Sequence, residues 1–286
     1  MSGYAGIASQ HSELIRKSLQ GSVFVAPITA AAIDTSTLFD SVTGDLASLP
    51  AGYVDLGWTS DVGATVARKV ASSDIMAWGD ASAVRSDVTS DVSTLQVIAL
   101  ETKLETIGLY TGVAKADITP GVNGVTVVEQ PSTPTATFYR LLVVGVDEGD
   151  SGEIVLARFL PRAQVTNYGN QVLSNGKSAL EWDLTFTGYQ DSVLGYAGSQ
   201  IYGGAGWLAL LTRMGLNKTV TCTVALTTAL VATTGTFSAE DVGQVVSGVG
   251  LVGGQTIDSV TDATHAVLSA AGTVAGSGVA VTIHGS

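Results

Sequence analysis

Alternating apolar and polar positions in residues 55–110 predict two successive β-strands. Val62, Val66 and Val70 share one parity, which is the period-two pattern of a half-buried strand. Residues 77–80 supply turn chemistry, and the alternation resumes at residue 84. The second strand is expected to place Val84, Val88 and Val92 on one face and Arg85, Asp87, Thr89 and Asp91 on the other. The apolar parity flips near residues 93–94, where we expect a β-bulge or a strand break.

After residue 99 the apolar period changes from two to that of a helix. Leu100, Leu104 and Ile107 fall at i, i+4 and i+7, which predicts a short amphipathic helix over residues 99–110 that ends at Gly112. Such a helix is too short to be stable alone. Leu100, Leu104 and Ile107 are therefore the candidate residues for packing it on a sheet.

Later segments predict further strands and few helices. Residues 138–146 and 153–160 flank an acidic turn and are typical of a hairpin, and residues 125–129 predict a short strand within a loop. In residues 180–187 apolar side chains alternate with acids and threonines. The predicted fold class is therefore mainly β: an antiparallel sandwich or barrel with one docked short α-helix.

Composition divides the chain into three expected parts. Residues 1–50 show little periodicity and are interpreted as an N-terminal arm and connector, and residues 51–215 as the main β-sandwich domain. Beyond residue 217 glycine, valine, threonine and alanine dominate, and charged residues become sparse. Residues 217–286 are expected to form a small all-β module, Ig-like or similar.

Charged residues are few and predominantly acidic. Asp, Glu, Lys and Arg make up 13% of the 286 residues, whereas about 25% is ordinary for a soluble domain. Obligate self-assembly explains the shortage, because interfaces between copies cover surface that a monomer must keep soluble. The net charge of −12 argues against ordinary DNA binding, which relies on Lys and Arg at phosphates. Apolar runs are too short for a spanning helix, so no membrane insertion is predicted.

The sequence offers no convergent catalytic or metal-binding set. Residues 248–253 match GxGxxG, but the residues that follow predict turn and strand instead of the helix that a dinucleotide site requires. Residues 147–153 depart from a calcium loop at several ligand positions. His11, His265 and His284 lie in separate regions, and the single cysteine, Cys222, reads as a small core residue. We therefore predict neither enzymatic activity nor a cofactor.

Two blocks of residues in a fixed order resemble a known family. The first block comprises Leu56-Gly57-Trp58-Thr59-Ser60-Asp61-Val62-Gly63, Ala77-Trp78-Gly79, Val84-Arg85, Thr94-Leu95-Gln96, Glu101-Thr102 and Leu109-Tyr110-Thr111-Gly112. The second comprises Phe138-Tyr139-Arg140-Leu141, Phe159-Leu160-Pro161-Arg162-Ala163 and Gly188-Tyr189-Gln190-Asp191-Ser192. Together they resemble the major tail tube protein of long, flexible-tailed bacteriophages (siphophages), particularly those of actinobacterial hosts.

The resemblance implies a structural subunit of the virion tail, assembled in the host cytoplasm. Its copies are expected to form stacked hexameric rings, an acidic-walled conduit for genome ejection through which duplex DNA passes without specific binding. It also implies the tape measure protein and tail terminal proteins as partners, and an outward-facing C-terminal module.

The acidic strand faces admit two interpretations. If the copies form a tube, the candidate lumen-facing acids are Asp87, Asp91, Glu181 and Asp183. On an ordinary antiparallel sheet the same acids would form a solvated outer face. The alternative function is a secreted or cell-surface β-rich adhesin or structural protein of a bacterium. Such a protein is expected to carry a signal peptide, and none is recognised here.

Overall fold

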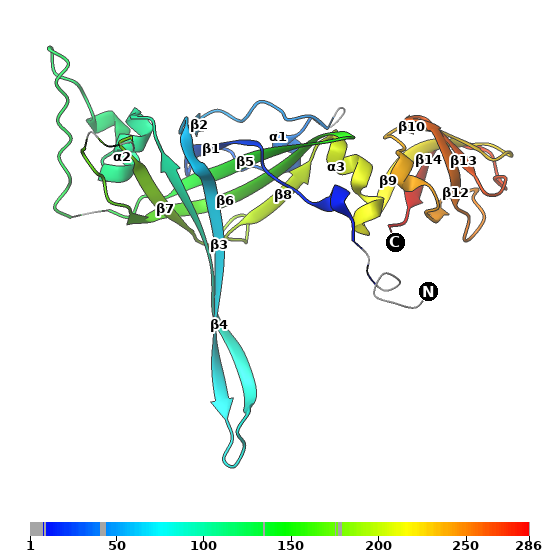
Figure 1. Ribbon diagram of the computed structural model, residues 1–286, viewed down its shortest axis with the longest axis horizontal. Coiled ribbons are helices and arrows are strands. Elements are labelled where there is room, and N and C mark those ends of the chain that lie inside the picture. The colour runs from blue at the N-terminus through cyan, green and yellow to red at the C-terminus, as the bar shows by residue number, and fades with distance from the viewer. Residues whose placement is uncertain are drawn as a thin grey trace. The chain divides into compact units, whose positions relative to one another are not determined.

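The computed structural model describes residues 8, 10–40, 44–133, 135–174, 176 and 179–285 (Figure 1). Parts of the predicted N-terminal arm, residues 1–7, 9 and 41–43, lie outside the described residues. The chain has two compact units. The larger comprises Ser18–Gly145 and Leu156–Ile201, and the smaller comprises the described residues of 1–17, Val146–Val155 and residues 202–285. The sequence-based division into residues 1–50, 51–215 and 217–286 stays a prediction.

The described elements are mostly strands. The helical elements are η2 (Ser12–Leu14), α1 (Thr35–Leu38), α2 (Leu104–Thr111), η3 (Lys115–Asp117), α3 (Ala205–Leu210), η4 (Thr212–Met214) and η5 (Ala239–Asp241). The strands are β1 (Gln20–Pro27), β2 (Val54–Asp55), β3 (Thr59–Met76), β4 (Ala83–Ala99), β5 (Tyr139–Gly149), β6 (Gly152–Tyr168), β7 (Trp182–Gly188), β8 (Ser199–Gly203), β9 (Lys218–Val224), β10 (Ala229–Thr234), β11 (Val246–Ser247), β12 (Ile257–Asp262), β13 (His265–Leu268) and β14 (Gly276–Ile283). The predicted mainly β fold with a C-terminal all-β module is confirmed.

One large antiparallel sheet organises the larger unit. Its strand order is β2-β1-β5-β6-β7-β4-β3, and β8 pairs with β6. β7 buries Trp182, Leu184 and Phe186 on one face, as its alternating pattern predicts. Leu95 of β4 lies opposite Phe186, and Val97 lies opposite Leu184, so the two strands bury the same face in one core.

Helix α2 packs against this core but begins later than predicted. It starts at Leu104 instead of residue 99, because Leu100 N–H donates to the Trp58 carbonyl and keeps that segment extended. Leu104 is 42% exposed, whereas Ile107 packs against the core and Leu109 is buried. The helix ends at Gly112, as predicted, with φ +72° in the left-handed region.

The C-terminal part of the smaller unit is a separate sheet with its own core. Its strand order is β11-β14-β9-β10-β13-β12. Val220, Cys222 and Val224 of β9 point into this core, where Phe237 also packs. The predicted core position of Cys222 is confirmed, and burial raises the pKa of its thiol to about 11.

Candidate interaction surfaces

β3 and β4 continue far beyond the sheet as a two-stranded ribbon (Figure 1). Their pairing runs from Thr59 opposite Ala99 to Met76 opposite Ala83, whereas β7 pairs with β4 only over residues 94–99. We call residues 68–93 the ribbon. Within the described part of the chain, no strand pairs with either outer edge of the ribbon. Its unpaired backbone groups can therefore pair with another chain.

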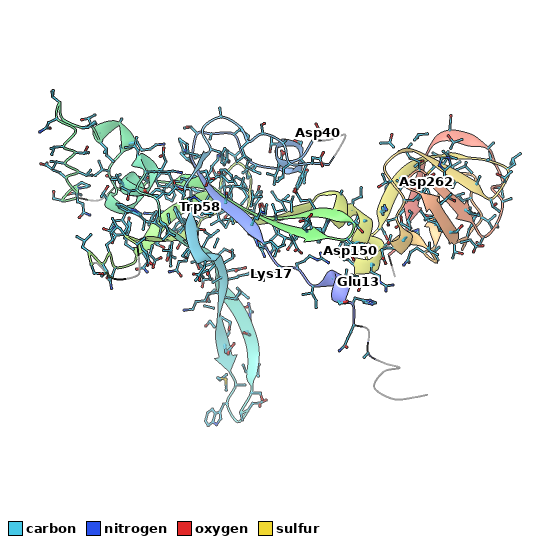
Figure 2. All side chains as sticks on the ribbon, turned by 45° about the horizontal axis from the view of Figure 1, so that its top comes forward. Glu13, Lys17, Asp40, Trp58, Asp150 and Asp262 are labelled. Atoms are coloured by element: carbon cyan, nitrogen blue, oxygen red, sulfur yellow. The ribbon has the colours of Figure 1, made fainter. Side chains whose placement is uncertain are left out.

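Large apolar side chains are exposed along the ribbon. Trp78 at its tip is fully exposed, and Figure 2 shows side chains projecting from both faces. The other exposed apolar side chains of the ribbon are Val70, Ile75, Met76, Val84 and Val88. A lone two-stranded ribbon is marginally stable in water, and surfaces of this kind are typical of assembly interfaces.

A β-bulge in β4 separates two acids that the sequence places together. Ala71 lies opposite Ser90 and Ser72 opposite Val88, so Thr89 is the extra residue. Asp91 therefore shares the face of Val70, while Asp87 lies on the other face. The prediction that Asp87 and Asp91 share a face is wrong. So is the expected bulge at residues 93–94, where the pairing is regular.

Asp87 and Asp91 of the ribbon each pair with an arginine. Arg68 Nε donates to Asp91 Oδ1 at 2.8 Å, and this hydrogen bond holds the pKa of Asp91 below its usual value. Arg85 Nε lies 2.9 Å from Asp87 Oδ2. These pairs offset the charge of Asp91 on one ribbon face and the charge of Asp87 on the other.

The solvent-side face of β4 and β7 is polar, with little charge. Asp183 points to this face, and its Oδ1 accepts a hydrogen bond from Gln96 Nε2 at 2.8 Å. Thr94 and Thr187 lie opposite each other on the same face. Glu181 precedes β7 and is half-buried. Of the four candidate acids, Asp87 and Asp183 share this face and its continuation along the ribbon, whereas Asp91 lies on the opposite face.

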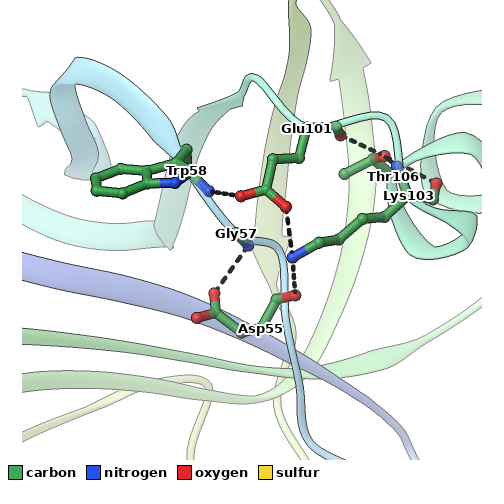
Figure 3. A network of polar contacts seen from close by, with 6 residues as sticks. All are labelled: Asp55, Gly57, Trp58, Glu101, Lys103 and Thr106. Atoms are coloured by element: carbon green, nitrogen blue, oxygen red, sulfur yellow. Dashed lines mark hydrogen bonds and ion pairs between the residues drawn. The ribbon is translucent and has the colours of Figure 1, made fainter.

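A polar network fixes the base of the β3–β4 hairpin, where β3 begins and β4 ends (Figure 3). Glu101 Oε1 accepts the Trp58 N–H at 2.8 Å, and Glu101 Oε2 lies 2.7 Å from Lys103 Nζ. The Gly57 N–H donates to Asp55 Oδ1 at 2.9 Å, and the Thr106 hydroxyl donates to the Glu101 carbonyl at 2.9 Å. The first residue block thus joins the start of β3 to the start of α2.

Trp58 lies at this base with its side chain largely exposed (Figure 2). Its backbone is held by Glu101, and the Trp58 carbonyl accepts the Leu100 N–H. A large aromatic side chain on a fixed backbone costs little entropy to bury, which is typical of interface anchors.

The second residue block also converges in space. The Arg162 guanidinium carbon lies 4.0 Å from the centre of the Phe138 ring, and Tyr189 packs edge-on against the same ring. Asp191 accepts the backbone N–H groups of Val193 and Leu194, which lowers the pKa of its carboxyl group. This block therefore stabilises one end of the sheet and needs no ligand to explain it.

The smaller unit contains a buried ion pair that was not predicted from the sequence. Lys218 Nζ lies 2.7 Å from Asp241 Oδ2, and both side chains are almost fully buried. Asp241 also accepts the Ser238 N–H and the Thr212 hydroxyl. The spacing of Ser238 and Asp241 matches a helix cap and is the one sequence signal for this network. It ties η4 to the C-terminal sheet.

The described residues show no arrangement typical of a metal site. No three His, Cys, Asp or Glu side chains gather among them, and no helix of that part is long and apolar enough to cross a membrane. The GxGxxG match lies between β11 and β12, where Gly250 has φ +83° and its carbonyl accepts the Thr273 N–H. Strand β12, not a helix, follows these glycines. Asp147 of the calcium-like segment pairs with Arg16 at 3.3 Å.

A family model described as phage tail tube protein matches residues 8–196, about two thirds of the chain. Both residue blocks, the ribbon and strands β1 to β7 of the large sheet lie inside this match, whereas β8 lies beyond it. No curated protein matches the sequence significantly.

Proposed function

The chain belongs to the phage tail tube protein family, and we propose that its copies form hexameric rings that stack into a conduit for genome ejection. The ribbon is the observation that carries this proposal. It exposes free strand edges and apolar side chains that a monomer has no means to cover. We also propose that the phage is a siphophage.

Ring closure uses the open ends of the large sheet. β3 ends the strand order on one side and β2 on the other, so neighbouring copies can pair edge to edge. Such pairing extends the antiparallel sheets into one wall around the channel. Helix α2 braces this wall, because Ile107 and Leu109 anchor it on the core.

Stacking uses the ribbon. Its tip carries Trp78 with Ile75 and Met76, all exposed. We assign these side chains to a contact with a copy in the next ring. A contact between two different surfaces of the same protein repeats without closing and so generates a filament.

The channel wall is formed by the polar face of β4 and β7. Asp183, Gln96 and Thr185 lie there together, and Asp87 continues the face along the ribbon. Because Arg85 pairs with Asp87, Asp183 is the main candidate for repelling DNA phosphates. Asp91 and Glu181 contribute less in this arrangement, since Asp91 lies on the opposite face and Glu181 precedes the strand.

Residues 217–286 face outward and are dispensable for the tube in this proposal. The tape measure protein and the tail terminal proteins are the expected partners at the lumen and the tube ends. The tube forms in the host cytoplasm and becomes part of the virion tail.

Negative-stain microscopy and sedimentation of the purified protein test the proposal. Rings or tubes are the expected result, and Trp78→Ser should weaken stacking while leaving the folded subunit intact. Val249→Ser, which removes an exposed apolar side chain outside the ribbon, is the control. A protein that stays monomeric at every concentration contradicts the proposed function.

Removing the C-terminal module tests its proposed place. A chain ending at residue 215 is expected to form tubes of smaller outer diameter, because the sheet and the ribbon remain. The cut removes Asp241, the partner of the buried Thr212 hydroxyl, so some loss of thermal stability is expected. A truncated chain that folds but forms no rings would show that the module takes part in assembly.

A further inference from the structure

Residues 119–133 form a long loop within the connection between η3 and β5. Buried Ile118 precedes it, and β5 begins at Tyr139. The described residues of this stretch contain no helix or strand, so the strand predicted over residues 125–129 does not form within the chain. Figure 1 shows the stretch, in green, as an extended loop beside α2. Loops of this length without secondary structure are uncommon and usually functional.

The side chains of this loop are unusual for a solvated segment. Val122, Val125 and Val127 are 112%, 60% and 69% exposed. Val128 is half-buried, and Val127 and Val128 both line a shallow hollow of about 450 Å³ together with Val113. Val127 remains largely exposed although it borders this hollow, so the segment is packed against the rest of the chain only in part.

The backbone of the loop is partly free. Residues 121–124 form a turn, in which Gly124 N–H donates to the Gly121 carbonyl at 2.8 Å and Gly121 N–H to the Val125 carbonyl at 2.8 Å. Within the described part of the chain, residues 126–133 make no backbone hydrogen bond to another backbone group. A valine-rich, extended segment with unpaired backbone groups is suited to joining a sheet edge.

We propose that residues 125–129 add as a strand to a free edge of the ribbon in a second copy of this chain. The inference rests on the proposed function, which brings copies together. The ribbon has the long unpaired edges, and it carries exposed Val84 and Val88 to pack against Val125 and Val127.

The loop is long enough for this contact. An extended chain spans about 3.3 Å per residue, so residues 125–129 can cover roughly 16 Å of a strand edge, which is enough for several backbone hydrogen bonds. Strand addition satisfies the backbone groups on both partners and covers valines that are otherwise exposed.

Hydrogen exchange on assembled tubes and on free subunits is the direct test. The amides of residues 126–129 are expected to exchange about a hundredfold more slowly in tubes than in free subunits. Alternate amides of one ribbon strand, those that do not face its partner strand, should be protected at the same time. Tubes in which residues 126–129 exchange as fast as in free subunits overturn this inference alone. A protein that never assembles contradicts the proposed function and this inference with it.

Two proline variants give a matched comparison. Val127→Pro removes an N–H in the middle of the segment and should raise the concentration needed for assembly about tenfold. Val122→Pro makes the same change at the second position of the turn, where proline is favoured, and should assemble like the unmodified protein. Equal thermal midpoints of the free subunits exclude a folding defect. Equal assembly of both variants overturns the inference.

Discussion

Gly57 and Glu101 hold the base of the β3–β4 hairpin against the start of α2. Gly57 has φ +85°, and a Cβ added there would overlap the Glu101 carboxylate. Glu101 cannot move aside freely, because it accepts the Trp58 N–H and pairs with Lys103. A side chain at residue 57 therefore introduces backbone strain and also breaks a polar network.

Gly57→Ala should lower the free energy of unfolding of the free subunit by about 1–3 kcal/mol. Gly63→Ala is the matched control, because Gly63 also has positive φ but nothing lies within 4 Å of an added Cβ. Urea unfolding of both variants measures the difference. Equal losses would show that the overlap with Glu101 has no effect.

Ionisation of the Glu101 carboxylate is expected to make the stability of the fold depend on pH. The hydrogen bonds from Lys103 and from the Trp58 N–H lower the pKa of Glu101. A lowered pKa in the folded state stabilises the fold above the ordinary glutamate pKa, and this contribution is lost as the pH falls through the folded-state value.

Glu101→Gln should therefore be less stable than the unmodified protein at pH 7, and the gap should close in acid. Glutamine still accepts the Trp58 N–H but cannot pair with Lys103. Thermal unfolding from pH 7 down to pH 3 measures the gap, with Glu129→Gln in the exposed loop as the control. A gap that stays constant across this range would exclude the ion pair as its source.

At the scale of elements, the buried Lys218–Asp241 pair links β9 to η5. Asp241 also bonds Thr212 of η4, and the Ser238 hydroxyl donates to the carbonyl of Ala209 in α3. Loss of one partner would leave the other charge buried and unpaired, which costs far more than the pair contributes.

Asp241→Asn should destabilise the smaller unit by about 3–5 kcal/mol, and Lys218→Met by a similar amount. The double variant should lose less than the sum, because it leaves no buried charge. Asp258→Asn on exposed β12 is the control. Calorimetry of the full chain should show the loss of stability in a single unfolding transition. If the loss in the double variant equals the sum of the two single losses, the two side chains are not directly coupled.

Periodicity in the sequence predicted the elements, but it did not predict how their faces line up. The β7 pattern and the β9 pattern were sufficient because each strand has one buried face. The ribbon has no buried face, so nothing in the pattern located the bulge at Thr89. The start of α2 was also missed, because it depends on contacts between Trp58, Leu100 and Glu101 that are distant in sequence.

At the scale of the whole molecule, self-assembly explains both the small number of charged residues and the exposed ribbon. The chain carries few charged residues, and the larger unit offers open sheet ends and an apolar ribbon. In the proposed tube, contacts between copies cover these surfaces, while the net charge of −12 stays available to act on a DNA molecule in the channel. The channel proposal therefore depends on which acids face the DNA.

Asp183→Lys tests that orientation. If Asp183 lines the channel, tubes of this variant should retain duplex DNA at low salt and release it as salt screens the new lysines. Asp258→Lys makes the same charge change on β12 of the C-terminal module, which the proposal places outside, and its tubes should not retain DNA in the channel. Retention is measured by co-sedimentation of short duplexes with intact tubes across a salt series. Equal behaviour of the two variants would mean that the polar face of β4 and β7 lies away from the channel. The ribbon face that carries Asp91 would then be the surface to test.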